Sequence, residues 1–454
     1  MLPDDDAHRR HGYRSWPIVC SGPHRDSLAW RPQHRPAPRP VRFPEEASWS
    51  VPSTAPQSPT GPADARGRLG ADPGRRGRGL TLAAALAQRG VQVDVVEAVG
   101  SDAVLGVGLN QPSNVLAALD EIGVRQACID AGFPFEELLL WSPASEQVAA
   151  IPPPAGLYGT PSNNAISRPL YNGILREAAE RAGARIRTGA TVWELTEDDA
   201  GVEVELATWT GKRTAPRRDG GADRRRYDLV VGFDGVRSRI REHLFGDRYV
   251  PVPTGFAVWR VVMPRPADVT HIVMALSGDV KAVLTPTSRT EMYIALVSPE
   301  PGNPRYERAD FARLVRERMT SFSGLIGQLR DGITDEQYVS YAPLESLMVR
   351  EPWFRGRVAI AGDAAHTSPP HLAQGAAMAV EDAVVLAASL DEHTSLPDAL
   401  DAWYLRRRDR AAFVADMSLA LLRQETGSEL TPADLELLQM GIPGAQARLA
   451  AQSY

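Results

Sequence analysis

The chain has 454 residues, of which 43% are hydrophobic, and its formal net charge at pH 7 is −6. This length is enough for two domains or one large two-part domain with a sizeable core. The mild acidity gives no reason to expect a nucleic acid or an anionic membrane surface as a partner, and no apolar run approaches the roughly 20 residues of a membrane span. The two cysteines, Cys20 and Cys128, are too few for a disulfide framework, so we expect a cytoplasmic location.

Residues 1–72 are rich in proline, arginine and serine and show no sustained apolar periodicity. Such a segment cannot offset its ordering entropy by burying side chains, so the composition predicts a disordered tail. An arginine-rich binding arm is the alternative.

The pattern changes at Leu80, where LTLAAALAQRG predicts a helix that ends at Gly90. The β-branched run VQVDVVE follows as a predicted buried strand that ends at Glu97. A carboxylate at the end of this strand can accept hydrogen bonds from both hydroxyls of an adenosine ribose. The alternative is a solvated charge at a strand end.

Helix and strand patterns alternate again over GILREAAERAGARIRTGATVWEL and YDLVVGFDG, whereas residues 251–350 contain strands separated by proline and glycine turns. The fold class predicted by this order is α/β, with a mainly antiparallel sheet inserted into the framework. The framework resumes with the strand GRVAIAGDAA and the helix GAAMAVEDAVVLAASL.

Residues 362–383 read GDAAHTSPPHLAQGAAMAVEDA and carry the most specific signal in the chain. A strand, Gly362-Asp363, a proline-containing loop and a helix that opens at Gly375 form a geometry that can hold a long polyhydroxylated chain. Asp363 would accept hydrogen bonds from hydroxyls, and free N–H groups near Gly375 and Ala376 would face a partial negative charge. The alternative is that Asp363 only caps a turn.

These motifs together resemble the FAD-dependent aromatic hydroxylases, the class A flavoprotein monooxygenases typified by para-hydroxybenzoate hydroxylase, and within them the methylnitrocatechol and salicylate hydroxylase-like branch. The resemblance covers Leu80 to about Arg410. It implies a Rossmann-like FAD-binding domain at 73–103, 162–250 and 351–390, a substrate domain at 104–161 and 251–350, and C-terminal helices at 391–454. The cofactor-binding residues that it implies are Gly74, Gly79, Glu97, Arg168, Asp234, Gly235, Gly362, Asp363, Gln374, Gly375, Ala376 and Ala377.

The resemblance also implies a reaction in which NAD(P)H reduces FAD, O₂ adds at flavin C4a, and the hydroperoxide hydroxylates a small phenolic substrate. An apolar cavity walled by the inserted sheet should exclude water, with Trp259 and Tyr293 as candidate wall residues. The alternative is that these strand aromatics belong to the ordinary core. His371, beside Pro370, is the candidate base for the phenol, and the alternative is a polar loop histidine without this role. The nine histidines show no metal-ligand pattern, and the oligomeric state is left open.

Residues 74–79 depart from the family, because they read GRRGRG where its members have Gly-Ala-Gly-x-Gly-Gly. The side chain of Arg76 would stand where backbone must approach pyrophosphate, and ADARGRLGADP is not expected to form a buried central strand. A shifted reading frame would account for both features, since Gly and Arg codons read one base later can spell Gly-Ala-Gly-Val-Gly-Gly. We therefore expect weak FAD binding, and the alternative function is a flavoprotein relic or a mispredicted reading frame.

Overall fold

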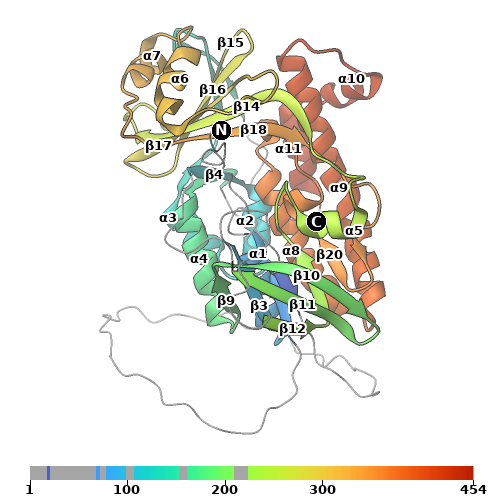
Figure 1. Ribbon diagram of the computed structural model, residues 1–454. Helices are drawn as coiled ribbons and strands as arrows, with labels where there is room; N and C mark the ends of the chain where they lie inside the picture. Colours follow the sequence, from blue (N-terminus) through green and yellow to red (C-terminus); the bar gives the residue numbers. More distant parts are fainter. Residues whose placement is uncertain are drawn as a thin grey trace, which may run out of the picture.

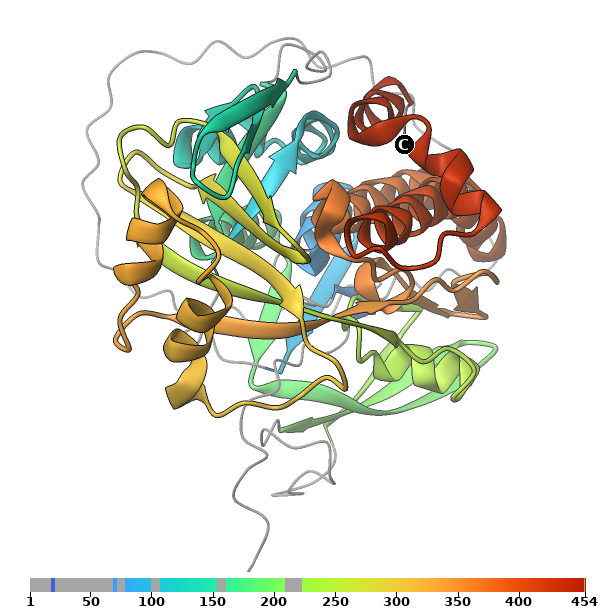
Figure 2. The same cartoon turned by 90° about the horizontal axis from the view of Figure 1, so that it is seen from above.

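The computed structural model describes residues 18–20, 68–71, 78–98, 107–152, 161–208, 223–452 and 454. Two large sheets and a group of long helices make up this part of the chain (Figures 1 and 2). The predicted α/β class is confirmed. Among the described residues, no helix combines the length and the apolar character that crossing a membrane requires.

The first large sheet belongs to the Rossmann-like part. Its neighbouring strands, in spatial order, are β19 (Phe354–Arg355), β20 (Val358–Ile360), β13 (Leu229–Gly232), β1 (Ile18–Cys20), β2 (Arg68–Ala71), β3 (Gln92–Glu97) and β9 (Arg185–Thr188). The expected helix before β3 is α1 (Arg78–Gln88), and Gly90 follows it with a φ of 80°. The helix and strand predicted from Leu80 to Glu97 are therefore present.

Our expectation that no strand precedes the glycine-rich turn is wrong. β2 pairs in parallel with β3, with Arg68 opposite Gln92 and Leu69 opposite Val93. The pairing uses backbone groups, which every residue except proline supplies in full, so a segment without an apolar run can still occupy this place. β1 also lies within residues 1–72 and pairs with β13 and β3. The rest of the predicted disordered tail lies outside the described residues.

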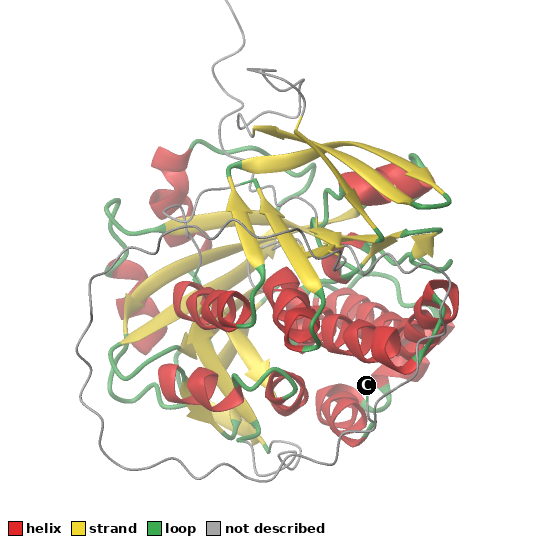
Figure 3. Cartoon of the chain, turned by 90° about the horizontal axis from the view of Figure 1, so that it is seen from below, coloured by secondary structure: helices red, strands yellow, loops and turns green. Residues whose placement is uncertain are grey.

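Helices cover one side of this sheet. α1 packs against α4 (Arg168–Arg181) and α8 (Gly375–Glu392), and α8 packs against the 30-residue helix α9 (Leu396–Glu425). Seen from below, several helices lie together beside the strands (Figure 3). The chain continues in α10 (Pro432–Leu438) and α11 (Gly441–Ala451). A three-stranded sheet contacts β3 and β13 of the first large sheet. Its strands are β10 (Ala190–Asp198), β11 (Gly201–Thr208) and β12 (Asp223–Tyr227).

The second large sheet is the inserted one. Its strands, in spatial order, are β18 (Val339–Ser346), β14 (Val252–Pro264), β17 (Glu291–Pro299), β16 (Val280–Pro286), β15 (Ile272–Ser277), β6 (Leu138–Trp141) and β7 (Gln147–Ile151). All pairs are antiparallel except β15 with β6. One face packs on α6 (Phe311–Arg318) and α7 (Gly324–Asp331).

The smaller elements connect the two large sheets. They are the three-stranded sheet of β4 (Gly108–Pro112), β8 (Asn163–Ser167) and β5 (Phe133–Phe135), together with α2 (Ser113–Asp120), α3 (Arg125–Ala131) and α5 (Arg239–Phe245). α2 packs against α8, and β8 contacts β16 of the inserted sheet. The second face of the inserted sheet is thus directed at the Rossmann-like part.

Candidate active site

Three strands that run in the same direction bring predicted cofactor residues to one edge of the first sheet. β13 is parallel to β20, and β1 is antiparallel to both β13 and β3, so β3, β13 and β20 share one direction. Glu97 is the last residue of β3 and is buried, while Asp234 and Gly362 follow the ends of β13 and β20. Nucleotide ligands of open α/β sheets bind at this carboxyl edge.

Asp234 is buried and holds the start of α5. Its Oδ2 atom accepts hydrogen bonds from the backbone N–H groups of Arg239, at 2.7 Å, and Ile240, at 3.1 Å. Burial raises the pKa of the Asp234 carboxyl, and a hydrogen bond from Ser238 partly opposes the shift. The Oδ1 atom is buried with no hydrogen-bond partner among the described residues. One carboxylate oxygen is therefore bound within the fold, and the other is available to a ligand donor.

Two predicted glycines occupy backbone conformations that favour glycine. Gly235 and Gly362 have φ values of 75° and 58°. At Gly362 an added Cβ would also lie 2.9 Å from the Cβ of Ala379 on α8. The N–H of Gly362 donates to Oδ2 of Asp382, at 2.9 Å. The turn after β20 is thus packed tightly against α8, which fixes the backbone of the residue that follows.

Asp363 is the residue carried by this turn. It is 8% exposed, and its carbonyl oxygen accepts a hydrogen bond from the hydroxyl of Thr367, at 2.7 Å. The turn is a short 3₁₀-helix, Gly362–Ala364. Its carbonyl at Ala364 also accepts a hydrogen bond from the Arg241 guanidinium, at 2.9 Å. The loop after β13 and the loop after β20 are therefore tied together.

The first turn of α8 offers free backbone donors. The N–H groups of Gly375, Ala376 and Ala377 make no hydrogen bond within the described part of the chain. A Cβ added at Gly375 would meet no heavy atom within 4 Å. A helix start with free N–H groups and open space beside it suits a negatively charged or oxygen-rich ligand. The predicted geometry after Gln374 is present.

Gln374 is held by a residue that the sequence did not single out. Its side-chain amide exchanges two hydrogen bonds with Asn114 of α2, at 3.0 and 3.2 Å. Asn114 also donates to Oε1 of Glu381, at 2.7 Å. This amide pair fixes the entry to α8 against α2.

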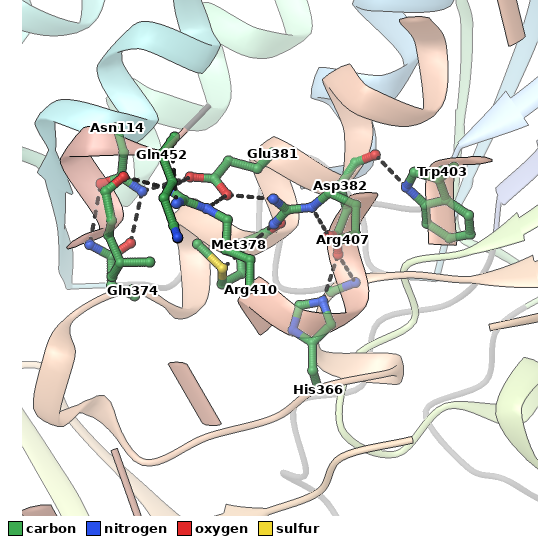
Figure 4. Close-up of polar contacts among 12 residues, drawn as sticks. Asn114, His366, Gln374, Met378, Glu381, Asp382, Trp403, Arg407, Arg410 and Gln452 are labelled. Carbon is green, nitrogen blue, oxygen red and sulfur yellow. Dashed lines mark hydrogen bonds and ion pairs between the residues drawn. The ribbon is translucent and has the colours of Figure 1, made fainter. Parts of the chain in front are cut away.

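A buried ionic network braces α8 from the other side (Figure 4). Arg407 of α9 donates to Oε2 of Glu381, at 2.7 Å, and to Oδ1 of Asp382, at 2.9 Å. Arg410 donates to both oxygens of Glu381, and Nε2 of His366 lies 2.6 Å from Oδ2 of Asp382. Burial disfavours the charge of Asp382, but His366 and Arg407 outweigh it and lower its pKa to about 2. The network is compact and fully paired.

Sequence reasoning missed the two arginines of this network. Glu381 and Asp382 stand next to each other in an otherwise apolar helix, and both are fully buried. Buried carboxylates need cationic partners, so this pair of acids in an apolar helix predicts that cationic side chains lie beside it. The sequence did not indicate which arginines these are. His366 contributes to this network through its contact with Asp382.

The remaining cofactor residues lie around α1 and α4. Arg168 begins α4, its N–H donates to the carbonyl of Val107, at 3.1 Å, and its Nε approaches the carbonyl of Gly108, at 3.4 Å. Gly79 is buried in the first turn of α1. Gly74 lies outside the described residues.

A cavity of about 190 Å³ lies where the inserted sheet meets β4, β8 and α4. Its lining residues are Val107, Ser167, Pro169, Val262, Thr287, Glu291, Met292 and Tyr293. The ring of Tyr293 lies against Gly108, where an added Cβ would come within 2.6 Å of it. The candidate wall residue Tyr293 is therefore at the boundary between the two parts.

The expectation for Trp259 is wrong. Its ring packs with Tyr306, Phe311 and Tyr341, whose ring centroids lie 5.5, 5.6 and 4.4 Å away. Its Nε1 donates to the hydroxyl of Ser298, at 3.1 Å. Strand alternation directs Trp259 to the face covered by α6 and α7, on the far side from the cavity.

His371, the candidate base, is completely buried. Its Nε2 atom is 3.1 Å from Oε2 of Glu425, and the Nζ of Lys281 is 2.5 Å from the same oxygen. The ring is not aligned for a hydrogen bond, and neither nitrogen has a hydrogen-bond partner among the described residues. Burial, and then Lys281, lower the pKa of the His371 imidazole. Pro370, its neighbour, is exposed at the start of the 3₁₀-helix Pro370–Leu372.

The comparison with protein families decides what this geometry belongs to. The model of the FAD binding domain family matches residues 74–418. The chain belongs to the FAD-dependent aromatic hydroxylases. It is a FAD-dependent oxidoreductase, and NAD(P)H is the co-substrate typical of its family. The hydroxylase interpretation is favoured over the relic or mispredicted reading frame, and the family match begins inside the arginine-rich turn.

Relatives of known sequence support the family. The YetM protein of Bacillus subtilis (strain 168), which bears the name of a FAD-dependent monooxygenase, is 32% identical over 361 residues, covering 77% of this chain and 92% of YetM. The 6-hydroxynicotinate 3-monooxygenase of Bordetella bronchiseptica is 30% identical over 353 residues, covering 73% of this chain and 85% of that enzyme.

Solved structures share the fold of the hydroxylase. Klebsiella pneumoniae HpxO in complex with FAD and uric acid superposes with a TM-score of 0.69 at 21% identity, covering 83% of this chain and 95% of HpxO. The tetrameric form of 2-methyl-3-hydroxypyridine-5-carboxylic acid oxygenase superposes with a TM-score of 0.62 at 25% identity, covering 80% of this chain and 94% of that one.

The residues present fit FAD. The buried Oδ1 of Asp234 has no partner among the described residues, and the start of α8 offers free N–H groups beside open space at Gly375; we call these features together the flavin cradle. Oxygen acceptors suit hydroxyls, and backbone donors suit a negatively charged group. The buried network of Arg407 and Arg410 with Glu381 and Asp382 braces α8, the helix that opens at Gly375.

Proposed function

We propose that this hydroxylase adds an oxygen atom to a small phenolic compound in the space between the flavin cradle and the sheet face that carries Tyr293. FAD reduced by NAD(P)H supplies the activation of O₂ and the oxygen transfer. Relatives named for 6-hydroxynicotinate and 3-hydroxybenzoate support a hydroxylated aromatic ring as substrate. A cytoplasmic location is also proposed, on the low cysteine content.

We propose the predicted domain division as well. Residues 73–103, 162–250 and 351–390 form the FAD-binding domain, 104–161 and 251–350 the substrate domain, and 391–454 the C-terminal helices. The clustering of Leu139, Trp259 and Phe322 in one core separate from that of α1 and α8 supports a distinct substrate unit.

In this proposal the acidic side chains at the carboxyl edge hold cofactor hydroxyls. Glu97 accepts from the ribose of the adenosine, and Asp363 accepts from the ribityl chain. One carboxylate oxygen of Asp234 already accepts hydrogen bonds from the start of α5, and the second oxygen accepts a hydrogen bond from a donor of the ligand. The start of α8 at Gly375 would hold a negatively charged part of the cofactor, because its free N–H groups carry partial positive charge.

The observation that carries the proposal is the state of His371. It lies on the loop between Asp363 and α8, it is fully buried, and neither ring nitrogen has a hydrogen-bond partner among the described residues. Its lowered pKa keeps the imidazole neutral near pH 7, which is the form that can accept a proton. Removing the phenol proton raises the electron density of the ring and favours its hydroxylation.

The test uses the purified full-length chain. Visible flavin absorbance reports bound FAD, and NADH and NADPH oxidation are followed with a panel of hydroxylated benzoates and hydroxypyridines. We expect at least one of these to accelerate NAD(P)H oxidation and to gain one oxygen atom by mass spectrometry. If the FAD-loaded chain is stimulated only by compounds without an aromatic hydroxyl, the phenolic assignment is wrong.

A further inference from the structure

Three titratable side chains from three separate elements meet beside the flavin motif: those of Lys281 and His371 are buried, and that of Glu425 is 18% exposed. Lys281 lies on β16, Glu425 is the last residue of α9, and His371 lies on the 3₁₀-helix Pro370–Leu372. Oε2 of Glu425 is 2.5 Å from Nζ of Lys281 and 3.1 Å from Nε2 of His371. We call these three residues the Lys281 cluster. It joins the inserted sheet, the end of α9 and the loop of the flavin motif.

Lys281 reaches this place because of the alternation along β16. Ala282 and Leu284 of the same strand pack in the core under α6 and α7. Successive side chains of a strand point to opposite faces, so Lys281 points to the opposite face of the sheet. The chain has only one other lysine, Lys212, among 50 basic residues. An ammonium is a compact charge, whereas a guanidinium needs room for a planar fork. A lysine therefore suits a contact with a single carboxylate oxygen in a closed space.

The charges of the cluster explain what the lysine does. With a neutral imidazole, Lys281 and Glu425 cancel and the buried cluster carries no net charge. Protonating His371 would leave one uncompensated positive charge, which burial disfavours. Without Lys281 the balance reverses, because a protonated His371 would then cancel Glu425. The lysine thus decides which form of the imidazole the buried site favours.

We propose that Lys281 is a positioning residue that neutralises Glu425 and so keeps the imidazole of His371 uncharged and able to accept a proton. The proposal deepens the proposed function and rests on the role of His371 in it. Among the described residues, the charged groups that act on the imidazole are Glu425 from α9 and Lys281 from β16. Burial and Lys281 lower the pKa of His371, and Glu425 opposes them.

The first experiment is an NMR pH titration of the histidine ring protons in the full chain, with His371→Gln identifying the resonance. Lys281→Met keeps the length of the side chain and removes the charge. We expect the titration midpoint of His371 to move to higher pH. The pH below which phenol binding weakens should move to higher pH with it. Asp279→Asn is the control, because Asp279 is an exposed acid two residues before Lys281. In this variant the titration midpoint of His371 should not move.

The second experiment repeats Lys281→Met in a Glu425→Gln background. The upward shift should disappear there, because no carboxylate remains to stabilise the imidazolium. If Lys281→Met does not fold, Lys281→Gln takes its place in both arms. A midpoint that stays or falls in the single variant overturns the proposal. A midpoint that rises while phenol binding keeps its pH dependence supports the role of Lys281 and contradicts the role of His371 in the proposed function.

Discussion

The two halves of the flavin cradle differ in how they are built. The back half, from Gly362 to Ala377, keeps the predicted motif, and it rests on α8, α9 and the paired network of Glu381, Asp382 and Arg407. The front half consists of β2, the arginine-rich turn and α1. It has its strand and its helix, but the sequence between them has arginines where the family has small residues.

The difference indicates which interactions each half can contribute. A braced loop holds Asp363 and the start of α8 in place before a ligand arrives, so little ordering remains to oppose binding. The front half should contribute close backbone contact with pyrophosphate, and the family pattern predicts that the side chain of Arg76, which lies outside the described residues, would obstruct this contact. We therefore expect changes in the front half to alter ligand contact alone, and changes beneath the back half to alter stability and ligand contact together.

The largest expected effect comes from restoring the front half. β2 supplies the strand, so only residues 74–79 need to be replaced by Gly-Ala-Gly-Val-Gly-Gly. The affinity for FAD should rise about a hundredfold or more, because each charge-assisted hydrogen bond to the diphosphate contributes roughly 1.5–3 kcal/mol. Flavin fluorescence titration of both chains measures it. A full flavin complement in the unmodified chain would make the arginine turn a genuine variant and remove the contrast between the halves.

The second effect tests the brace under the back half. Arg407→Met leaves Glu381 and Asp382 buried with one cation fewer, so the free energy of unfolding should fall by about 3–5 kcal/mol. Urea denaturation measures the loss. Arg406→Met is the matched control, because Arg406 is 38% exposed and pairs with Glu392 at the surface, where the expected loss is about 0–1 kcal/mol. Equal losses in the two variants would show that the network does not brace α8.

Local patterns predicted much of this cradle. The helix after Leu80, the strand that ends at Glu97, the loop of Asp234 and the helix that opens at Gly375 each follow from a short run of residues, and each is present. Such features depend on neighbours in the chain, which the sequence displays directly.

Features that depend on distant residues could not be predicted in the same way. The alternation of apolar residues predicts that Trp259 and Tyr293 lie on strands of the inserted sheet. Only the packing of α6 shows which face of that sheet is covered by helices. The same holds for β2, where pairing with β3 outweighs a poor side-chain pattern. Lys281, Glu425 and His371 are separated by up to 144 residues and meet only in the fold.

A third effect concerns a single residue of the back half. Asp363→Ala removes an acceptor for the ribityl hydroxyls, and an unpaired hydroxyl in a buried site costs about 1–3 kcal/mol. The dissociation constant for FAD should therefore rise roughly 5- to 150-fold, as measured by isothermal titration in the chain with the restored turn. Asp409→Ala, at an 84% exposed side chain, should leave it unchanged. An unaltered affinity in Asp363→Ala would remove Asp363 from the cradle.

The smallest effect returns to the front half, at Glu97. This residue is 3% exposed at the end of β3, so Glu97→Gln preserves the size of the side chain and the position of one acceptor oxygen. A hydrogen bond to a neutral amide has about half the strength of one to a carboxylate, so the affinity should fall by about 1 kcal/mol, roughly fivefold. The loss should be equal for FAD and for AMP, which shares the adenosine ribose but lacks the flavin. Glu436→Gln, at an exposed residue of α10, serves as the control. A loss for FAD without a loss for AMP would place Glu97 elsewhere on the cofactor, and the front half would then contribute no ribose contact through this residue.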